Sequence, residues 1–154
     1  MSGPASDRRL RILIERILAD SGRGEGLIHG LAHWEQVAAN AASLARGEGV
    51  NSPIPGLFAY FHDCRRHNDG ADPEHGARAG DYVQTFSAAQ LGLSPDDRER
   101  LIFACRHHNR EIRTEDAAVQ ICWDADRLDL PRVGIRVDPD RLFTKTARNL
   151  AEGR

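Results

Sequence analysis

Residues 57–63 read Leu-Phe-Ala-Tyr-Phe-His-Asp, an apolar run that ends in an imidazole and a carboxylate. Such a run is typical of a segment that is buried in a protein core. A carboxylate that leaves water needs a cation or hydrogen bonds to offset its desolvation. His and Asp are both good ligands for divalent metals, so this segment predicts a buried helix that ends at a metal site.

The composition indicates one domain without a marked electrostatic bias. The chain has 154 residues, which is enough for a substantial core, and we expect residues 1–154 to form a single domain. It carries 21 Lys and Arg against 23 Asp and Glu, with Lys145 as the only Lys. This balance lacks the signature of a nucleic-acid-binding protein. The seven His are the unusual count.

The cysteines and the apolar segments bear on the location of the protein. Cys64, Cys105 and Cys122 are an odd number without CxxC spacing, which favours reduced thiols of a cytosolic protein. No run approaches the ~20 apolar residues of a membrane span. Residues 1–9 are polar and charged, with no signal-peptide core behind them. We therefore expect a cytoplasmic protein without a membrane partner, and we leave a homo-oligomer open.

Apolar residues recur at helical spacing, and period-2 alternation is absent over any useful length. The pattern predicts an all-α bundle of six or seven helices, with a metal site between helices and a core at 27–130. A glycine-rich break at 22–26 follows the first helix. A short hairpin around 131–137 is the alternative for that segment. The predicted helices cover 7–20, 30–46, 53 or 55 to 63, 73–86, 95–108, 114–130 and 140–150.

Two helix starts have a specific signal. Asp72-Pro73 and Ser94-Pro95 each place a capping residue before a proline. Proline is tolerated at the first helical position, where its missing N–H has no partner to lose. We therefore expect helices to begin at Pro73 and at Pro95.

Several polar residues continue the apolar faces of their predicted helices, at three or four residues from an apolar neighbour. A single inward His is more often a hydrogen-bonded core residue than a ligand, and the inward Asp could instead pair with Arg127 or Arg106. Residues from separate helices that point into one interior nevertheless form metal sites in helical bundles. Asp63 directly follows His62, one of these residues, and together they favour a metal site. The residues that continue the apolar faces are His33, His62, His108 and Asp126.

The order of these residues resembles the HD superfamily of metal-dependent phosphohydrolases. Residues 33–38 (His-Trp-Glu-Gln-Val-Ala), 58–63 and 124–128 (Asp-Ala-Asp-Arg-Leu) are similar to the segments that supply the ligands of its first metal. The resemblance covers roughly residues 27–130. It implies an HD-like helical fold and one divalent ion. The ligands that it implies are His33, His62, Asp63 and Asp126.

Two further segments resemble those of HD proteins that hold two metals. Residues 72–77 are similar to a segment that contains a His-Gly pair, and residues 104–108 are similar to a later segment whose His aligns with His108. The resemblance implies that Asp63 bridges to a second ion bound by His75 and His108. The identity of the metal is open among Mn, Fe, Ni, Co, Mg and Zn.

The resemblance also implies a small phosphorylated substrate, such as a nucleotide. Arg66 stands where many HD proteins have a Lys that contacts the substrate phosphate, and Arg can make that contact with two hydrogen bonds. Asp63 and Arg66 are the expected catalytic residues. The expected substrate-binding residues are His29, Arg65, Arg66, Arg106 and His107.

The mechanism that the resemblance implies is metal-assisted hydrolysis of a phosphate monoester or diester. Two other functions stay open. Some HD proteins use an iron pair in an oxygenase, and this chain has His29 and His107 as spare ligands. A sensor or scaffold domain that binds metal without catalysis is the other, although the complete ligand set argues against a relict site.

Overall fold

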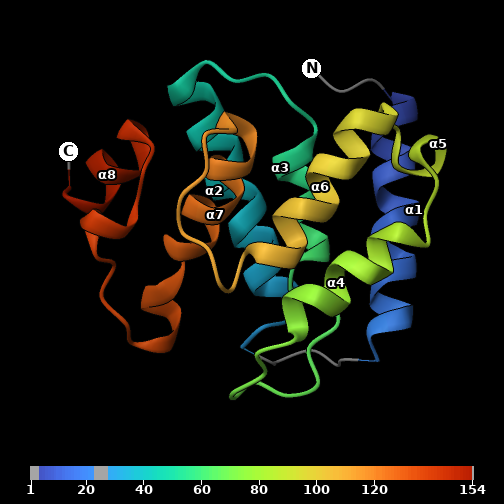
Figure 1. The fold of residues 1–154 in the computed structure, drawn as a ribbon, viewed down its shortest axis with the longest axis horizontal. Coiled ribbons are helices and arrows are strands. Elements are labelled where there is room, and N and C mark those ends of the chain that lie inside the picture. Colours follow the sequence, from blue (N-terminus) through green and yellow to red (C-terminus); the bar gives the residue numbers. More distant parts are fainter. Residues whose placement is uncertain (1–3, 23–27, 154) are drawn as a thin grey trace.

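The computed structural model describes residues 4–22 and 28–153, and the described chain is built from helices (Figure 1). The expected all-α class is therefore confirmed. Within the described ranges no helix is long and apolar enough to span a bilayer. The elements are α1 (Pro4–Ser21), α2 (Leu31–Glu48), α3 (Ile54–Phe61), α4 (His75–Gln84), α5 (Ala88–Leu91), α6 (Pro95–His107), α7 (Ala117–Arg127), η1 (Leu130–Val133), η2 (Pro139–Arg141) and α8 (Lys145–Ala151).

The described part of the chain holds eight α-helices, one more than the upper end of the prediction. The additional helix is α5. It begins with a capping box between Ser87 and Gln90 and ends at Gly92, which has a φ of 69°. Its four residues are too few for an apolar period to show. The alternative hairpin at 131–137 is wrong, because η1 occupies its first half. Residues 23–26 of the predicted break, and residue 27 at the start of the predicted core, lie outside the described residues.

The two proline-based helix starts have different outcomes. Ser94 caps α6 through a hydrogen bond from the backbone N–H of Asp97, as expected. The prediction for Pro73 is wrong, because α4 begins two residues later at His75. The carboxylate of Asp72 instead accepts hydrogen bonds from the backbone N–H of His67 and from the guanidinium of Arg78. Those bonds hold the loop before α4. The Asp72 carboxylate is therefore not the cap of a helix that begins at Pro73.

Helix α3 lies in the middle of the molecule, where it contacts α2, α7, α6 and α1 (Figure 1). Phe58 and Phe61 on this helix have no exposed surface. Full burial of a side chain of this size stabilises the fold by roughly 1.5–3 kcal/mol. Because α3 ends inside the molecule, the residues that follow it, His62 and Asp63, are buried as well.

Helices α4 and α6 pack closely because two glycines of α4 face α6. A β-carbon on Gly76 would lie 2.9 Å from the carbonyl oxygen of Arg106, closer than real β-carbons approach. Gly80 faces the side chain of the same arginine. This approach brings the first residue of α4, His75, next to His108 at the end of α6.

Asp124 fastens the C-terminal segment to α7. Its buried carboxylate accepts hydrogen bonds from the backbone N–H of Thr144 at 2.7 Å and from the Thr144 hydroxyl at 2.8 Å. The backbone N–H of Phe143 donates to it as well. A buried carboxylate with this many donors is well satisfied. The segment between α7 and α8 is therefore held against the end of α7 that carries Asp126.

Candidate metal centre

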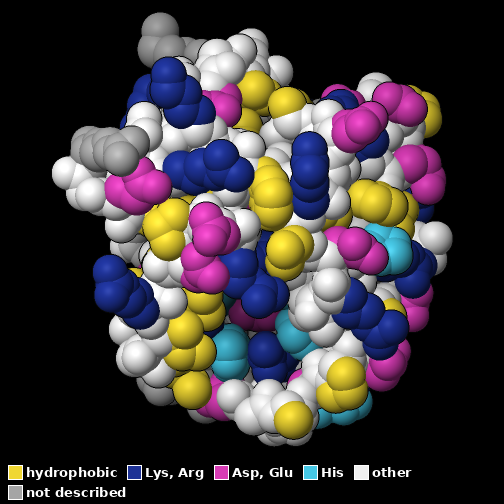
Figure 2. Space-filling model, turned by 60° about the vertical axis from the view of Figure 1, so that its left-hand side comes forward, with side chains coloured by type: hydrophobic (Ala, Val, Ile, Leu, Met, Phe, Trp, Pro, Cys, Tyr) yellow, Lys and Arg dark blue, Asp and Glu magenta, His cyan; other side chains and the backbone are white. Residues whose placement is uncertain are grey.

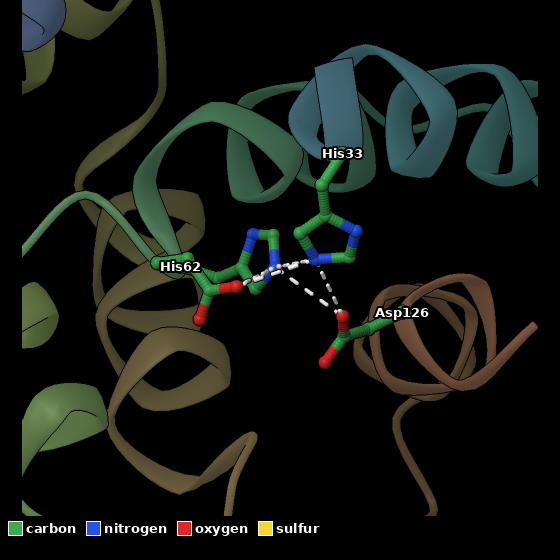
Figure 3. Close-up of side chains that lie close together, drawn as sticks. His33, His62 and Asp126 are labelled. Carbon is green, nitrogen blue, oxygen red and sulfur yellow. Dashed lines mark hydrogen bonds and ion pairs between the residues drawn. The ribbon is translucent and has the colours of Figure 1, made fainter. Parts of the chain in front are cut away.

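Within the described residues, two groups of side chains bring metal-ligating atoms together, and the groups share Asp63. In each group the ligand atoms lie within 4.8 Å of one another. Figure 3 shows three side chains of the first group pointing toward one another from α2, from the end of α3 and from α7. The first group consists of His33, His62, Asp63 and Asp126, and the second of Asp63, His75 and His108.

The carboxylate of Asp63 turns one oxygen toward each group. Its Oδ2 lies 3.2 Å from Nε2 of His33 and 3.3 Å from Nε2 of His62. Its Oδ1 lies 3.2 Å from Nε2 of His75 and 3.5 Å from Nε2 of His108. A carboxylate with this orientation can give one oxygen to each of two ions.

Two of the four imidazoles are oriented by the ends of their own helices. His62 follows α3, and its Nδ1 donates to the carbonyl oxygen of Ala59 at 2.9 Å. His108 follows α6, and its Nδ1 donates to the carbonyl oxygen of Cys105 at 2.7 Å. The last carbonyls of a helix lack partners within the helix, so these rings satisfy them. In both residues Nε2 is left to face the centre.

The other two imidazoles also donate from Nδ1, but to oxygens outside their own helices. His33 donates from Nδ1 to Oδ2 of Asp129 at 2.7 Å, and His75 donates from Nδ1 to the carbonyl oxygen of Asp72 at 2.6 Å. Metal-binding His side chains nearly always donate their second N–H in this way. Sequence reasoning missed Asp129. Its place three residues after Asp126, nearly one helical turn, is the signal that could have found it.

The pairs of Nε2 atoms lie too close together for neutral imidazoles. His33 and His62 are 3.1 Å apart at Nε2, and His75 and His108 are 2.9 Å apart. Carbonyl and carboxylate oxygens accept, so each Nδ1 carries the proton and each neutral Nε2 presents a lone pair. Burial lowers the pKa of His108, which favours its neutral form. Facing lone pairs repel unless a proton or a metal ion lies between them.

The electrostatics of the first group call for positive charge. Burial alone lowers the pKa of His62, but the charges of Asp63 and Asp126 outweigh it and raise that pKa to about 10. Burial also lowers the pKa of His33, and hydrogen bonds to the two carboxylates raise it above its usual value. Burial favours protonated carboxyls, yet His62 and neighbouring hydrogen bonds hold the pKa values of Asp63 and Asp126 well below their usual range. One divalent ion would balance the two carboxylates.

Arg66 and His29 lie beside Asp63. The Nε atom of Arg66 is 3.4 Å from Oδ1 of Asp63, and its Nη1 donates to the carbonyl oxygen of Gly70. The Nδ1 atom of His29 is 3.4 Å from Oδ2 of Asp63. Arg132 donates to that same Nδ1 at 3.0 Å, because a guanidinium can only donate. In this arrangement His29 borders the first group without a free Nδ1.

The structure does not place the other three expected substrate-binding residues with the ligand groups. Each has a side-chain contact elsewhere: Arg65 with the carbonyl oxygen of Asp20, Arg106 with the carboxylate of Asp81, and His107 with the ring of Phe103. Arg106 therefore pairs with Asp81 rather than with Asp126. Arg127, the other partner considered for Asp126, donates to the carbonyl oxygen of Glu111.

A cavity of about 360 Å³ reaches the two groups. Its lining includes Asp126 of the first group and His108 of the second. Figure 2 shows a hollow in the molecule with acidic and His side chains inside it and basic side chains around it. A volume of this size suits a small-molecule ligand. The buried His and Asp groups could thus bind metal within reach of such a ligand.

The fold is shared with a solved structure, the crystal structure of a predicted HD superfamily hydrolase from an uncultured Thermotogales bacterium. The match has a TM-score of 0.72 and 24% sequence identity, and it covers 93% of this chain and 83% of the other. No family model and no curated protein sequence matches the chain. The described residues thus form an all-helical fold with a candidate metal centre. The chain shares the fold of this predicted HD superfamily hydrolase, so the resemblance seen in the sequence is confirmed at the level of the fold.

Proposed function

We propose that this chain is a metal-dependent hydrolase of the HD type that cleaves a phosphate ester of a small metabolite. One observation carries the proposal: the carboxylate of Asp63 turns one oxygen to each of two groups of buried Nε2 atoms. The shared fold with a predicted HD superfamily hydrolase supports it. The arrangement fits a pair of divalent ions about one bridging carboxylate, as two-metal hydrolytic sites use.

The residues present fit the metal. His33, His62, Asp63 and Asp126 would hold one ion, and Asp63, His75 and His108 would hold the other. When bound, divalent ions polarise a phosphoryl group and lower the pKa of water. The protein fixes the ligand geometry through the Nδ1 hydrogen bonds.

Arg66 would neutralise the phosphate oxygens. It lies beside Asp63 and so beside the place where a phosphate on the metals would sit. A guanidinium that faces charge as it develops in the transition state lowers the barrier to reaction. Because Arg66 is no ligand in either group, its role is separable from metal binding.

The competing oxygenase function would draw on further ligands at the second ion. In the described chain the second group has three members, and neither His29 nor His107 belongs to a group. His29 accepts from Arg132 at Nδ1, and His107 lies against Phe103. These contacts favour the hydrolase over the oxygenase.

The experiment starts from protein stripped of metal and reloaded with each of Mn²⁺, Co²⁺, Ni²⁺, Mg²⁺, Zn²⁺ and Fe²⁺. Phosphate release from a panel of monoesters, diesters and nucleotides is then measured, together with oxygen consumption. We expect hydrolysis that depends on metal. Bound iron with oxygen consumption and no hydrolysis would point to the oxygenase, and failure to bind any metal would point to a non-catalytic domain.

Two adjacent histidines supply a matched pair for the metal analysis. We expect His108→Gln to lose metal, because it removes one of three members of the second group. His107→Gln should keep the wild-type metal content, because its ring contacts Phe103 outside both groups. Equal metal content in the two variants would remove His108 from the site.

A further inference from the structure

Beyond the two ligand groups, three arginines line the cavity that reaches them: Arg127, Arg136 and Arg141. Arg127 belongs to α7, directly after Asp126. Arg136 lies between η1 and η2, and Arg141 ends η2. The cavity therefore joins the candidate metal centre to arginines of the C-terminal segment, far in sequence from Arg66, the residue that the sequence favoured for phosphate binding.

Two of these arginines have guanidinium N–H groups that could donate to a ligand. Across residues 4–22 and 28–153, Arg136 and Arg141 have no hydrogen bond or ion pair through their guanidinium groups, and both are exposed. Arg127 instead donates to the carbonyl oxygens of Glu111 and Trp123. Burial lowers the pKa of Arg127, the charge of Asp126 raises it, and the nearby charge of Arg141 lowers it again. Neighbouring guanidiniums repel unless an anion lies near them.

The charge in the cavity is positive once the metal ligands are set aside. Asp126 belongs to the first ligand group, so Asp138 is the one other carboxylate in the lining of this cavity. An Oδ1 atom of Asp138 accepts from the backbone N–H of Asp140. Three guanidiniums against one carboxylate favour a ligand with several negative charges, because Arg binds phosphate oxygens with two parallel hydrogen bonds.

We propose that Arg136 and Arg141 form a subsite for a second phosphate of the substrate, beyond the phosphate that is cleaved. This inference rests on the proposed function, which places the reacting phosphate at the metal centre, and His108 and Asp126 of that centre line one part of the cavity. A polyphosphate chain that runs from there along the cavity meets the two arginines. Nucleoside diphosphates and triphosphates are substrates of this class.

The remaining lining of the cavity suits the rest of such a substrate. Leu130, Ile135 and Val137 supply apolar surface beside the arginines. Ile135 is 51% exposed, which is high for a large aliphatic side chain. An apolar surface at the rim of a charged cavity can contact a nucleoside base.

The kinetic test compares ATP with AMP on the metal-loaded enzyme. In the double variant Arg136→Gln with Arg141→Gln, we expect the ratio of kcat/KM for ATP to that for AMP to fall about tenfold or more, because two charge-assisted hydrogen bonds are lost. The matched control is Arg8→Gln with Arg11→Gln, which removes the same charge from the exposed face of α1. An unchanged ratio in the first double variant would overturn the subsite.

A binding test separates this inference from the proposed function. Metal-free protein is titrated with inorganic tripolyphosphate, orthophosphate and citrate by calorimetry. We expect tripolyphosphate to bind most tightly, and the Arg136/Arg141 double variant to weaken its Kd about tenfold or more. If tripolyphosphate binds in this way but the metal-loaded protein hydrolyses no phosphate ester, the proposed hydrolase function is wrong and the subsite still holds. Equal binding of citrate, or an unchanged Kd in the variant, would overturn the assignment to polyphosphates.

Discussion

Replacing Asp63 with Asn is the sharpest perturbation of the proposed centre. The side chain keeps its size and one oxygen but loses its charge and its second oxygen. Asp63 is the one residue that both ligand groups share, with Oδ2 toward His33 and Oδ1 toward His75. An amide nitrogen is no metal ligand, so the variant can serve at most one ion. We expect the metal content of Asp63→Asn to fall by at least one ion per chain.

The size of the effect on stability follows from linkage. An ion present at 100 times its Kd stabilises the folded protein by about 2.7 kcal/mol. For a chain of this size each kcal/mol shifts Tm by roughly 2–4 °C, so one ion raises Tm by about 5–11 °C. A 100-fold loss of affinity at the same metal concentration leaves about 0.4 kcal/mol, or a rise of about 1–2 °C.

The assay measures Tm by calorimetry with chelator and with added Mn²⁺, alongside elemental analysis. Asp124→Asn is the matched control, because Asp124 is also a buried carboxylate but accepts from Thr144 and Phe143 instead of facing the imidazoles. The control should lower Tm equally with and without metal. If Asp63→Asn kept both the wild-type metal content and the wild-type rise in Tm, the assignment of Asp63 would be wrong.

Three further predictions address the surroundings of the centre. Asp129→Asn should weaken metal affinity roughly 10–100-fold in a competition titration, because it loses the charged acceptor of His33 Nδ1; unchanged affinity would make Asp129 incidental. Arg66→Ala should keep the metal content but cut turnover of a phosphate ester by about 10²-fold. Wild-type kinetics in this variant would show that Arg66 has no role in catalysis. Asp116→Ala should lower the free energy of unfolding of the metal-free protein by about 1–2 kcal/mol at pH 7, because Asp116 caps α7. A hydrogen bond from Arg100 holds the pKa of Asp116 below its usual value, so this stability is present above about pH 4 and lost as the pH falls further. In urea unfolding, the difference in free energy of unfolding between wild type and Asp116→Ala should therefore be smaller at pH 3 than at pH 7.

The sequence predicted most of the helical fold because long amphipathic segments carry a strong period. Helix α5 was not predicted because its four residues are too few to show an apolar period, and a capping box and Gly92 define its two ends. The start at Pro73 was misplaced because Asp72 bonds to Arg78 and to the loop instead of capping α4. Tertiary bonds of this kind leave no local pattern.

Most candidate ligands were recognisable because they continue apolar helix faces, where a polar side chain is costly, whereas His75 was proposed only from the resemblance of residues 72–77 to HD proteins with two metals. Asp129 was missed because its spacing of three residues from Asp126 gains meaning only once the orientation of the His33 ring is known. Arg136 and Arg141 were missed because the segment between η1 and α8 has no apolar period. Its place beside the cavity depends on bonds to Asp124, which are distant in sequence.

The most direct measurement of the central claim is anomalous diffraction from a crystal of the protein loaded with Mn²⁺. We predict two anomalous peaks, one on each side of the Asp63 carboxylate. The first should be in contact with Nε2 of His33 and His62, and the second with Nε2 of His75 and His108. Fewer than two peaks at Asp63, or imidazoles that face the metal through Nδ1, would contradict the claim that this carboxylate joins two metal sites.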